Sequence, residues 1–92
     1  MKQQLPDSFM LGTKRYKVSK NKKLPKLTNG RVYPAVGLIE LSPDKSDSTE
    51  TFWHEVTHAI LEDMGHPWRN EAFVKAFSKR LTEVIRTAKF NG

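Results

Sequence analysis

The pentapeptide His54-Glu55-Val56-Thr57-His58 decides how the rest of this chain is interpreted. Residues four apart lie one turn apart on the same face of an α-helix, so the two imidazoles can bind one metal ion. The glutamate between them then falls beside the open coordination position, where its carboxylate can deprotonate a zinc-bound water. The spacing therefore predicts a zinc site on a helix, with His54 and His58 as metal ligands and Glu55 as the catalytic general base.

The sequence around the pentapeptide predicts a helix over residues 47–65. Asp47-Ser48-Thr49-Glu50 is typical of a capping box in which Asp47 is the N-cap. Gly65 is a plausible C′ residue, and Pro67 prevents the helix from continuing. Between these ends, four apolar residues have the spacing of one buried helix face: Val56, Ala59, Ile60 and Met64.

A second helix is predicted over residues 70–89, with Asn70 as its N-cap. Its apolar residues recur with the helical period: Phe73, Phe77, Leu81, Val84, Ile85 and Ala88. We expect this face to pack on the apolar side of the first helix, with the lysines and arginines of the segment outside.

Residues 9–41 are predicted to be rich in β-structure, and residues 1–8 to be loose. Strand signals occur over residues 9–18, 31–33 and 36–41. The Asn29-Gly30 dipeptide predicts a tight turn. Together with the helices, this pattern predicts one α+β domain over residues 1–92, with about three antiparallel strands followed by two packed helices.

Composition narrows the class of protein. The absence of cysteine from the 92 residues excludes disulfides and a thiolate metal site. No apolar run is long enough to span a membrane and no signal peptide pattern begins the chain, so we expect a soluble, cytoplasmic protein without a membrane partner. Nothing in the sequence indicates an oligomeric state.

The net charge of +6 is a mild bias toward acidic partners, and residues 14–26 are especially basic. One interpretation of this segment is a contact surface for nucleic acid or an acidic protein. The other is the solvated face of a hairpin and its loop, which is favoured because Tyr16 is the only aromatic residue among the cations. The cations are Lys14, Arg15, Lys17, Lys20, Lys22, Lys23 and Lys26.

A catalytic zinc needs a third protein ligand and leaves its fourth position for water. The five residues before Asn70 can span about 15 Å, enough to bring Glu71 in the first turn of the second helix back to the metal. His66 follows directly on the helix stop, about 12 Å along the axis from His58. Reach therefore favours Glu71, with His66 as the alternative. The candidates for stabilising the oxyanion are Tyr16, Tyr33, His66 and Arg69.

His54-Glu55-x-x-His58, followed by Asn70-Glu71-Ala72-Phe73 at the start of an apolar helix, resembles the zincin-like metallopeptidases. More narrowly it is similar to the minimal gluzincins, to short zincin-like proteins of bacteriophages and mobile elements, and to the ImmA/IrrE-type and SprT-like peptidases. In ImmA/IrrE relatives the second helix begins with a Glu-Ala-type motif whose glutamate is a ligand, which implies Glu71 as the third zinc ligand. SprT-like proteins carry a histidine there. The resemblance covers about residues 36–88.

The resemblance implies a zinc-dependent metallopeptidase, a hydrolase that takes a protein or peptide substrate and Zn²⁺ as its cofactor. A bacteriophage origin would place it in the host cytoplasm. Two alternatives stay open: a nonenzymatic interaction or regulatory module that keeps the zincin fold, and a nucleic-acid-associated protein that uses residues 14–26.

Overall fold

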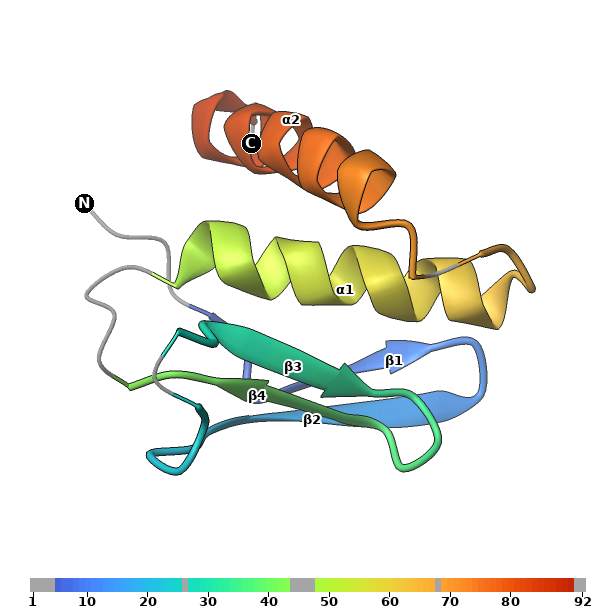
Figure 1. The fold of residues 1–92 in the computed structure, drawn as a ribbon. Helices are drawn as coiled ribbons and strands as arrows, with labels where there is room; N and C mark the ends of the chain where they lie inside the picture. Colours follow the sequence, from blue (N-terminus) through green and yellow to red (C-terminus); the bar gives the residue numbers. More distant parts are fainter. Residues whose placement is uncertain (1–4, 26, 44–47, 68, 91–92) are drawn as a thin grey trace.

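The computed structural model describes residues 5–25, 27–43, 48–67 and 69–90. The chain is α+β, as predicted, and its elements lie in three layers (Figure 1). The elements are β1 Ser8–Leu11, β2 Lys14–Lys20, β3 Gly30–Tyr33, β4 Leu38–Leu41, α1 Thr49–Asp63 and α2 Glu71–Thr87. One face of the sheet carries α1, and α2 lies over α1 on the side away from the sheet (Figure 1).

The sheet has four strands in the order β1-β2-β4-β3, and it is mixed rather than antiparallel. The single strand predicted over residues 9–18 is in fact a hairpin, because Gly12 turns the chain with a φ of +63°. The β1–β2 and β3–β4 pairs are antiparallel, whereas β2 and β4 pair in parallel, with Val18 opposite Ile39. Within the described residues β3 is therefore an edge strand that pairs with β4 alone.

The parallel pairing brings the β3–β4 turn against the first half of β2. The amide of Lys17 donates a 2.9 Å hydrogen bond to the carbonyl of Gly37, which has a φ of +67°. A Cβ added to Gly37 would lie 2.5 Å from the carbonyl oxygen of Arg15. Only glycine fits this position, for both conformational and steric reasons.

We expect Gly37→Ala to destabilise the fold by at least about 3 kcal/mol, because the clash with Arg15 adds to the cost of a left-handed alanine. Gly12→Ala is the matched control, since its φ is also positive but its nearest neighbour would be 3.7 Å away. That variant should lose only about 1 kcal/mol. Urea denaturation measures the free energy of unfolding of both variants. Equal decreases would show that the close approach of Gly37 to Arg15 does not affect stability.

The core lies between the sheet and α1. Its buried apolar residues are Tyr16, Ile39, Leu41, Phe52, Val56 and Ala59. The rings of Phe9 and Tyr16 stack at 5.2 Å, and Phe52 meets Phe9 edge to face at 6.0 Å. Burial of these side chains fixes α1 on the sheet and so orients the pentapeptide.

The helix ends agree in part with the sequence analysis. The N-cap of α1 is Ser48, without a side-chain capping bond, and the predicted N-cap Asp47 lies outside the described residues. Gly65 ends α1 with a φ of +74°, and Asn70 is confirmed as the N-cap of α2, because its Oδ1 accepts a 3.1 Å hydrogen bond from the amide of Phe73.

The prediction for the buried face of α2 was wrong at Phe73, Phe77, Val84 and Ala88, whereas Leu81 and Ile85 are half-buried. Phe73, Phe77 and Val84 are 46–60% exposed, and the buried residues are Val74, Ser78 and Thr82. Glu71 shares the stripe of these three, because spacings of three and four residues keep side chains on one face. Directing Glu71 toward α1 therefore turns the aromatic face of α2 outward.

Candidate metal centre

Helix α1 presents its two histidines to the space below α2. Their rings lie 5.0 Å apart, centroid to centroid, on successive turns. The side chain of His58 is almost fully buried, whereas that of His54 is 22% exposed. The core packing of Phe52 and Val56 on the opposite side of α1 holds this face toward the cleft.

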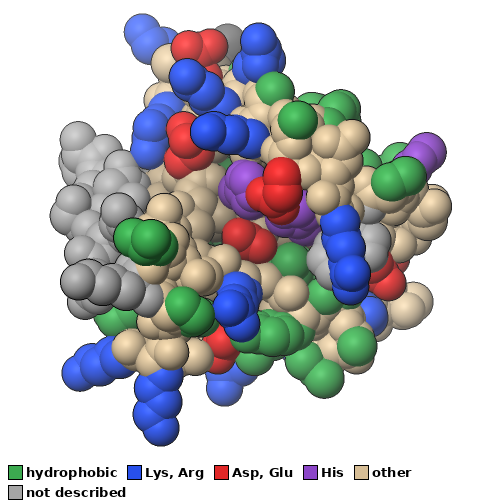
Figure 2. Space-filling model, in the orientation of Figure 1, with side chains coloured by type: hydrophobic (Ala, Val, Ile, Leu, Met, Phe, Trp, Pro, Cys, Tyr) green, Lys and Arg blue, Asp and Glu red, His purple; other side chains and the backbone are tan. Residues whose placement is uncertain are grey.

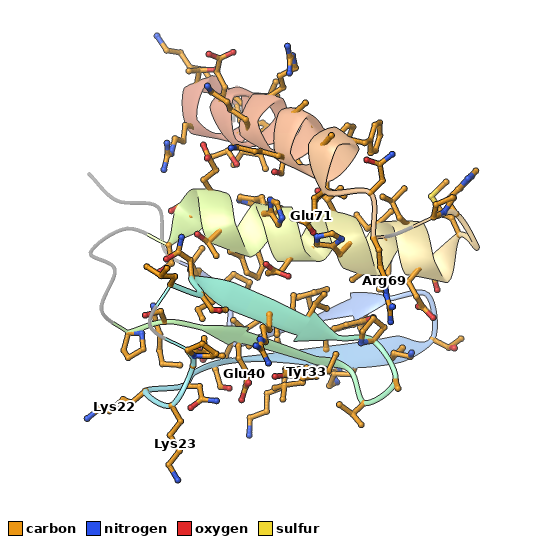
Figure 3. All side chains as sticks on the ribbon, viewed as in Figure 1. Lys22, Lys23, Tyr33, Glu40, Arg69 and Glu71 are labelled. Carbon is orange, nitrogen blue, oxygen red and sulfur yellow. The ribbon has the colours of Figure 1, made fainter. Side chains whose placement is uncertain are left out.

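Glu71 reaches both histidines from the first turn of α2. Its Oε1 lies 2.7 Å from Nε2 of His58, and its Oε2 lies 3.2 Å from Nε2 of His54. One ligand atom from each of the three residues falls within 4.8 Å of the others, so the group can hold a metal ion. We call His54, His58 and Glu71 the candidate metal centre; its position is shown in Figure 3 at the Glu71 label.

His66, the alternative third ligand, does not join this group among the described residues. It is exposed, just beyond Gly65 at the end of α1. Its amide donates a hydrogen bond to the carbonyl of Leu61, which completes the helix C-cap rather than turning the chain toward the histidines. Among the described residues after α1, Glu71 is the one that joins the two histidines in this group.

Ser78 is a functional candidate that the sequence analysis missed. Its Oγ lies 3.5 Å from Nδ1 of His54, the ring nitrogen on the side away from Glu71. A polar partner on the second ring nitrogen fixes the orientation of a ligating imidazole. Ser78 follows Glu71 by seven residues, so the two side chains lie two turns apart on one helix face. This spacing points to Ser78 only after Glu71 has been identified as a ligand.

Glu55 lies beside the candidate metal centre and is 8% exposed. Burial raises its pKa from 4.5 to about 7; the charge of His58 opposes this rise and the charge of Glu71 adds to it. A carboxyl group whose pKa is near neutrality is suited to accept a proton and return it. The environment of Glu55 therefore fits the role that the pentapeptide predicts.

The burial of Glu55 predicts how the stability of the metal-free protein depends on pH. Because the folded-state pKa is about 7, above 4.5, the folded chain keeps this proton to higher pH than the unfolded chain. The protonated Glu55 contributes its full stabilisation below pH 4.5. As the pH rises from there to about 7, the free energy of unfolding falls by about 3 kcal/mol. Glu55→Gln should therefore stabilise the metal-free chain at pH 8 by up to that amount, and little at pH 4.

Thermal or urea denaturation of the metal-free protein at the two pH values measures the difference. Glu83→Gln, at an exposed position of α2, is the matched control, and it should change stability little at either pH. An equal effect of Glu55→Gln at both pH values would contradict the predicted loss of the proton.

Two adjoining hollows open on the candidate metal centre, with volumes of about 310 and 280 Å³. Both are lined by Gly30, His54, Glu55 and Glu71; the first extends toward Lys75, and the second toward Arg69. In Figure 2, histidine and acidic side chains meet near the centre of the face, with basic groups beside them. The site is thus a shallow cleft between β3 and the two helices.

Gly30 explains how β3 comes so close to α1. The predicted Asn29-Gly30 turn is absent, because Gly30 opens β3 and its φ is not positive. A Cβ on Gly30 would lie 2.8 Å from Cγ2 of Thr51. The glycine therefore serves a close approach between strand and helix, rather than a turn.

The structure separates the four candidates for stabilising an oxyanion. Tyr16 is buried in the core, and Tyr33 lies on the sheet face away from the helices, as its label in Figure 3 shows. His66 lines neither hollow. Arg69 is the candidate that lines the cleft, in the hollow it shares with His58 and Glu71.

No protein-family model, curated protein or solved structure matches this chain. Within the described residues, neither helix is long and apolar enough to cross a membrane.

Proposed function

We propose that this protein is a zinc-dependent metallopeptidase. The observation that carries the proposal is the convergence of three ligand atoms beside a buried glutamate: Nε2 of His54, Nε2 of His58 and the Glu71 carboxylate, next to Glu55. Two histidines and one glutamate form a ligand set typical of catalytic zinc.

The spacing of these atoms supports a metal ion held between the three residues. Their ligand atoms all lie within 4.8 Å of one another, and the Glu71 carboxylate lies 2.7 Å from His58 and 3.2 Å from His54. Zinc held there would act as a Lewis acid and lower the pKa of a bound water.

The remaining chemistry belongs to this chain's own residues. The carboxylate of Glu55 takes a proton from the attacking water and passes it to the nitrogen of the leaving amine. Ser78 holds the ring of His54 in its orientation through Nδ1. Burial of Glu55 keeps bulk water from competing for the proton.

The edge strand supports a peptide as the substrate. β3 pairs only with β4 within the described residues, and Gly30, Arg31 and Val32 line the second hollow beside the histidines. The free edge of a strand offers main-chain donors and acceptors to an extended peptide. A peptide paired there would run along the candidate metal centre.

Incubation of the zinc-loaded protein with a degenerate peptide library, followed by mass spectrometry, tests the proposal. We expect cleavage that a chelator abolishes and added zinc restores. One zinc per chain with no cleavage of any peptide would favour the nonenzymatic module instead. Failure to bind zinc would remove both possibilities.

A further inference from the structure

The face of the sheet that points away from both helices is uncovered in the described part of the chain (Figure 1). Side chains alternate between the two faces along each strand. Because Ile39 and Leu41 are buried in the core, Glu40 points to the opposite face. Its cross-strand partner Arg31 lies on that face too, and so does Tyr33 two residues later.

The same alternation places cations of β2 on this face. Tyr16 and Val18 pack toward the core, so Arg15 and Lys17 point away from it. Its pairing with Glu40 puts Arg31 of β3 on the same face, although 16 positions separate it from Arg15 in the sequence. We define the outer face by Arg15, Lys17, Arg31 and Tyr33.

Charge on the outer face is strongly positive. Lys22 and Lys23 add two cations in the turn after β2, on the side away from the helices (Figure 3). The carboxylate of Glu40 stands among them, but it accepts a 3.0 Å hydrogen bond from the side chain of Asn21. This side of the sheet therefore carries five cations and one carboxylate.

Tyr33 supplies the aromatic residue that the sequence of residues 14–26 lacks. It lies opposite Leu38, and Leu38 lies opposite Lys17 on the next strand. Strands about 4.8 Å apart put Tyr33 about 10 Å from Lys17 across the sheet. An aromatic ring among cations at this range suits a base stacked on the ring with its phosphates on the cations.

We propose that the outer face binds single-stranded nucleic acid. A surface rich in cations attracts a polyanion such as the phosphate backbone of a nucleic acid. Only an unpaired strand can present a base to Tyr33 on a flat sheet. Arg31 also lines the second hollow, but the outer face contains none of the three residues of the candidate metal centre, so binding of nucleic acid does not require zinc.

Fluorescence anisotropy with a labelled single strand of about 12 nucleotides tests the proposal. The triple variant Arg15→Glu, Lys17→Glu, Arg31→Glu should weaken binding at least tenfold and reduce the slope of log affinity against log salt by about 2. The matched control reverses three exposed cations, Lys79 and Arg80 in α2 and Lys89 just after it, with the same change in net charge. It should retain most of the affinity.

Tyr33→Ala should weaken binding about 5- to 150-fold, whereas Tyr33→Phe should not. If the triple variant unfolds, as judged by circular dichroism, the neutral set Arg15→Gln, Lys17→Gln, Arg31→Gln takes its place. The proposal is overturned by absence of binding at low salt, by equal loss in the α2 control, or by binding of a duplex as tight as that of the single strand.

Discussion

Replacing Glu55 by glutamine should lower the rate of peptide hydrolysis by about 10²- to 10⁴-fold while leaving zinc bound. Glutamine keeps the size of the side chain but cannot accept the proton of the attacking water. Glu55 is not among the three residues whose ligand atoms converge, so the metal affinity should stay near that of the wild type. Values of kcat/KM on a cleaved library peptide, together with zinc stoichiometry, measure the two effects separately.

Glu83→Gln is the control for Glu55→Gln, because it makes the same chemical change at an exposed position of α2. It should retain full activity and full zinc content. Undiminished turnover by Glu55→Gln would exclude Glu55 as the general base, and loss of zinc from that variant would mean that Glu55 acts in metal binding.

Replacing Glu71 by alanine should weaken zinc binding by at least about a hundredfold. Loss of a group that only supports a ligand already costs 10- to 100-fold, and Glu71 contacts both histidines directly. His66→Ala should leave the affinity within about threefold of the wild type, because His66 is exposed and lies outside the converging group. Competition with a chromophoric chelator gives the two affinities.

A second control separates the ligand role of Glu71 from its charge. Glu71→Gln keeps the shape of the side chain and one oxygen, so it should bind zinc more weakly than the wild type but more tightly than Glu71→Ala. A large loss in His66→Ala with none in Glu71→Ala would reverse the assignment of the third ligand. Circular dichroism should show α2 intact in all three variants.

Local features of this chain were predictable because local physics sets them. A four-residue spacing puts His54 and His58 on one helix face in any helix. Asn70 caps α2 and Gly65 ends α1, because these side chains and backbone angles satisfy helix ends without help from distant residues. The short connection to Glu71 limited the third ligand to very few residues.

The hairpin and the glycines show where prediction from the sequence ended. The turn at Gly12 was missed, and Asn29-Gly30 was taken for a turn although Gly30 serves a contact with Thr51. The sequence does not distinguish a glycine that provides a positive φ from a glycine that makes room for a neighbouring side chain. Only the approach of β3 to α1 tells these roles apart.

By itself, the sequence determined the α+β class, the two helices and the candidate ligands, since these follow from spacing within one or two turns. Tertiary structure alone decided the parallel pairing of β2 with β4. This pairing places the edge of β3 beside the cleft, and it gathers Arg31 and Tyr33 with Lys17 on the outer face. It also decided which face of α2 is buried. Periodicity measures how apolar a face is, but the packing of α2 places Glu71 and Ser78 over His54 and leaves Phe73 and Phe77 exposed.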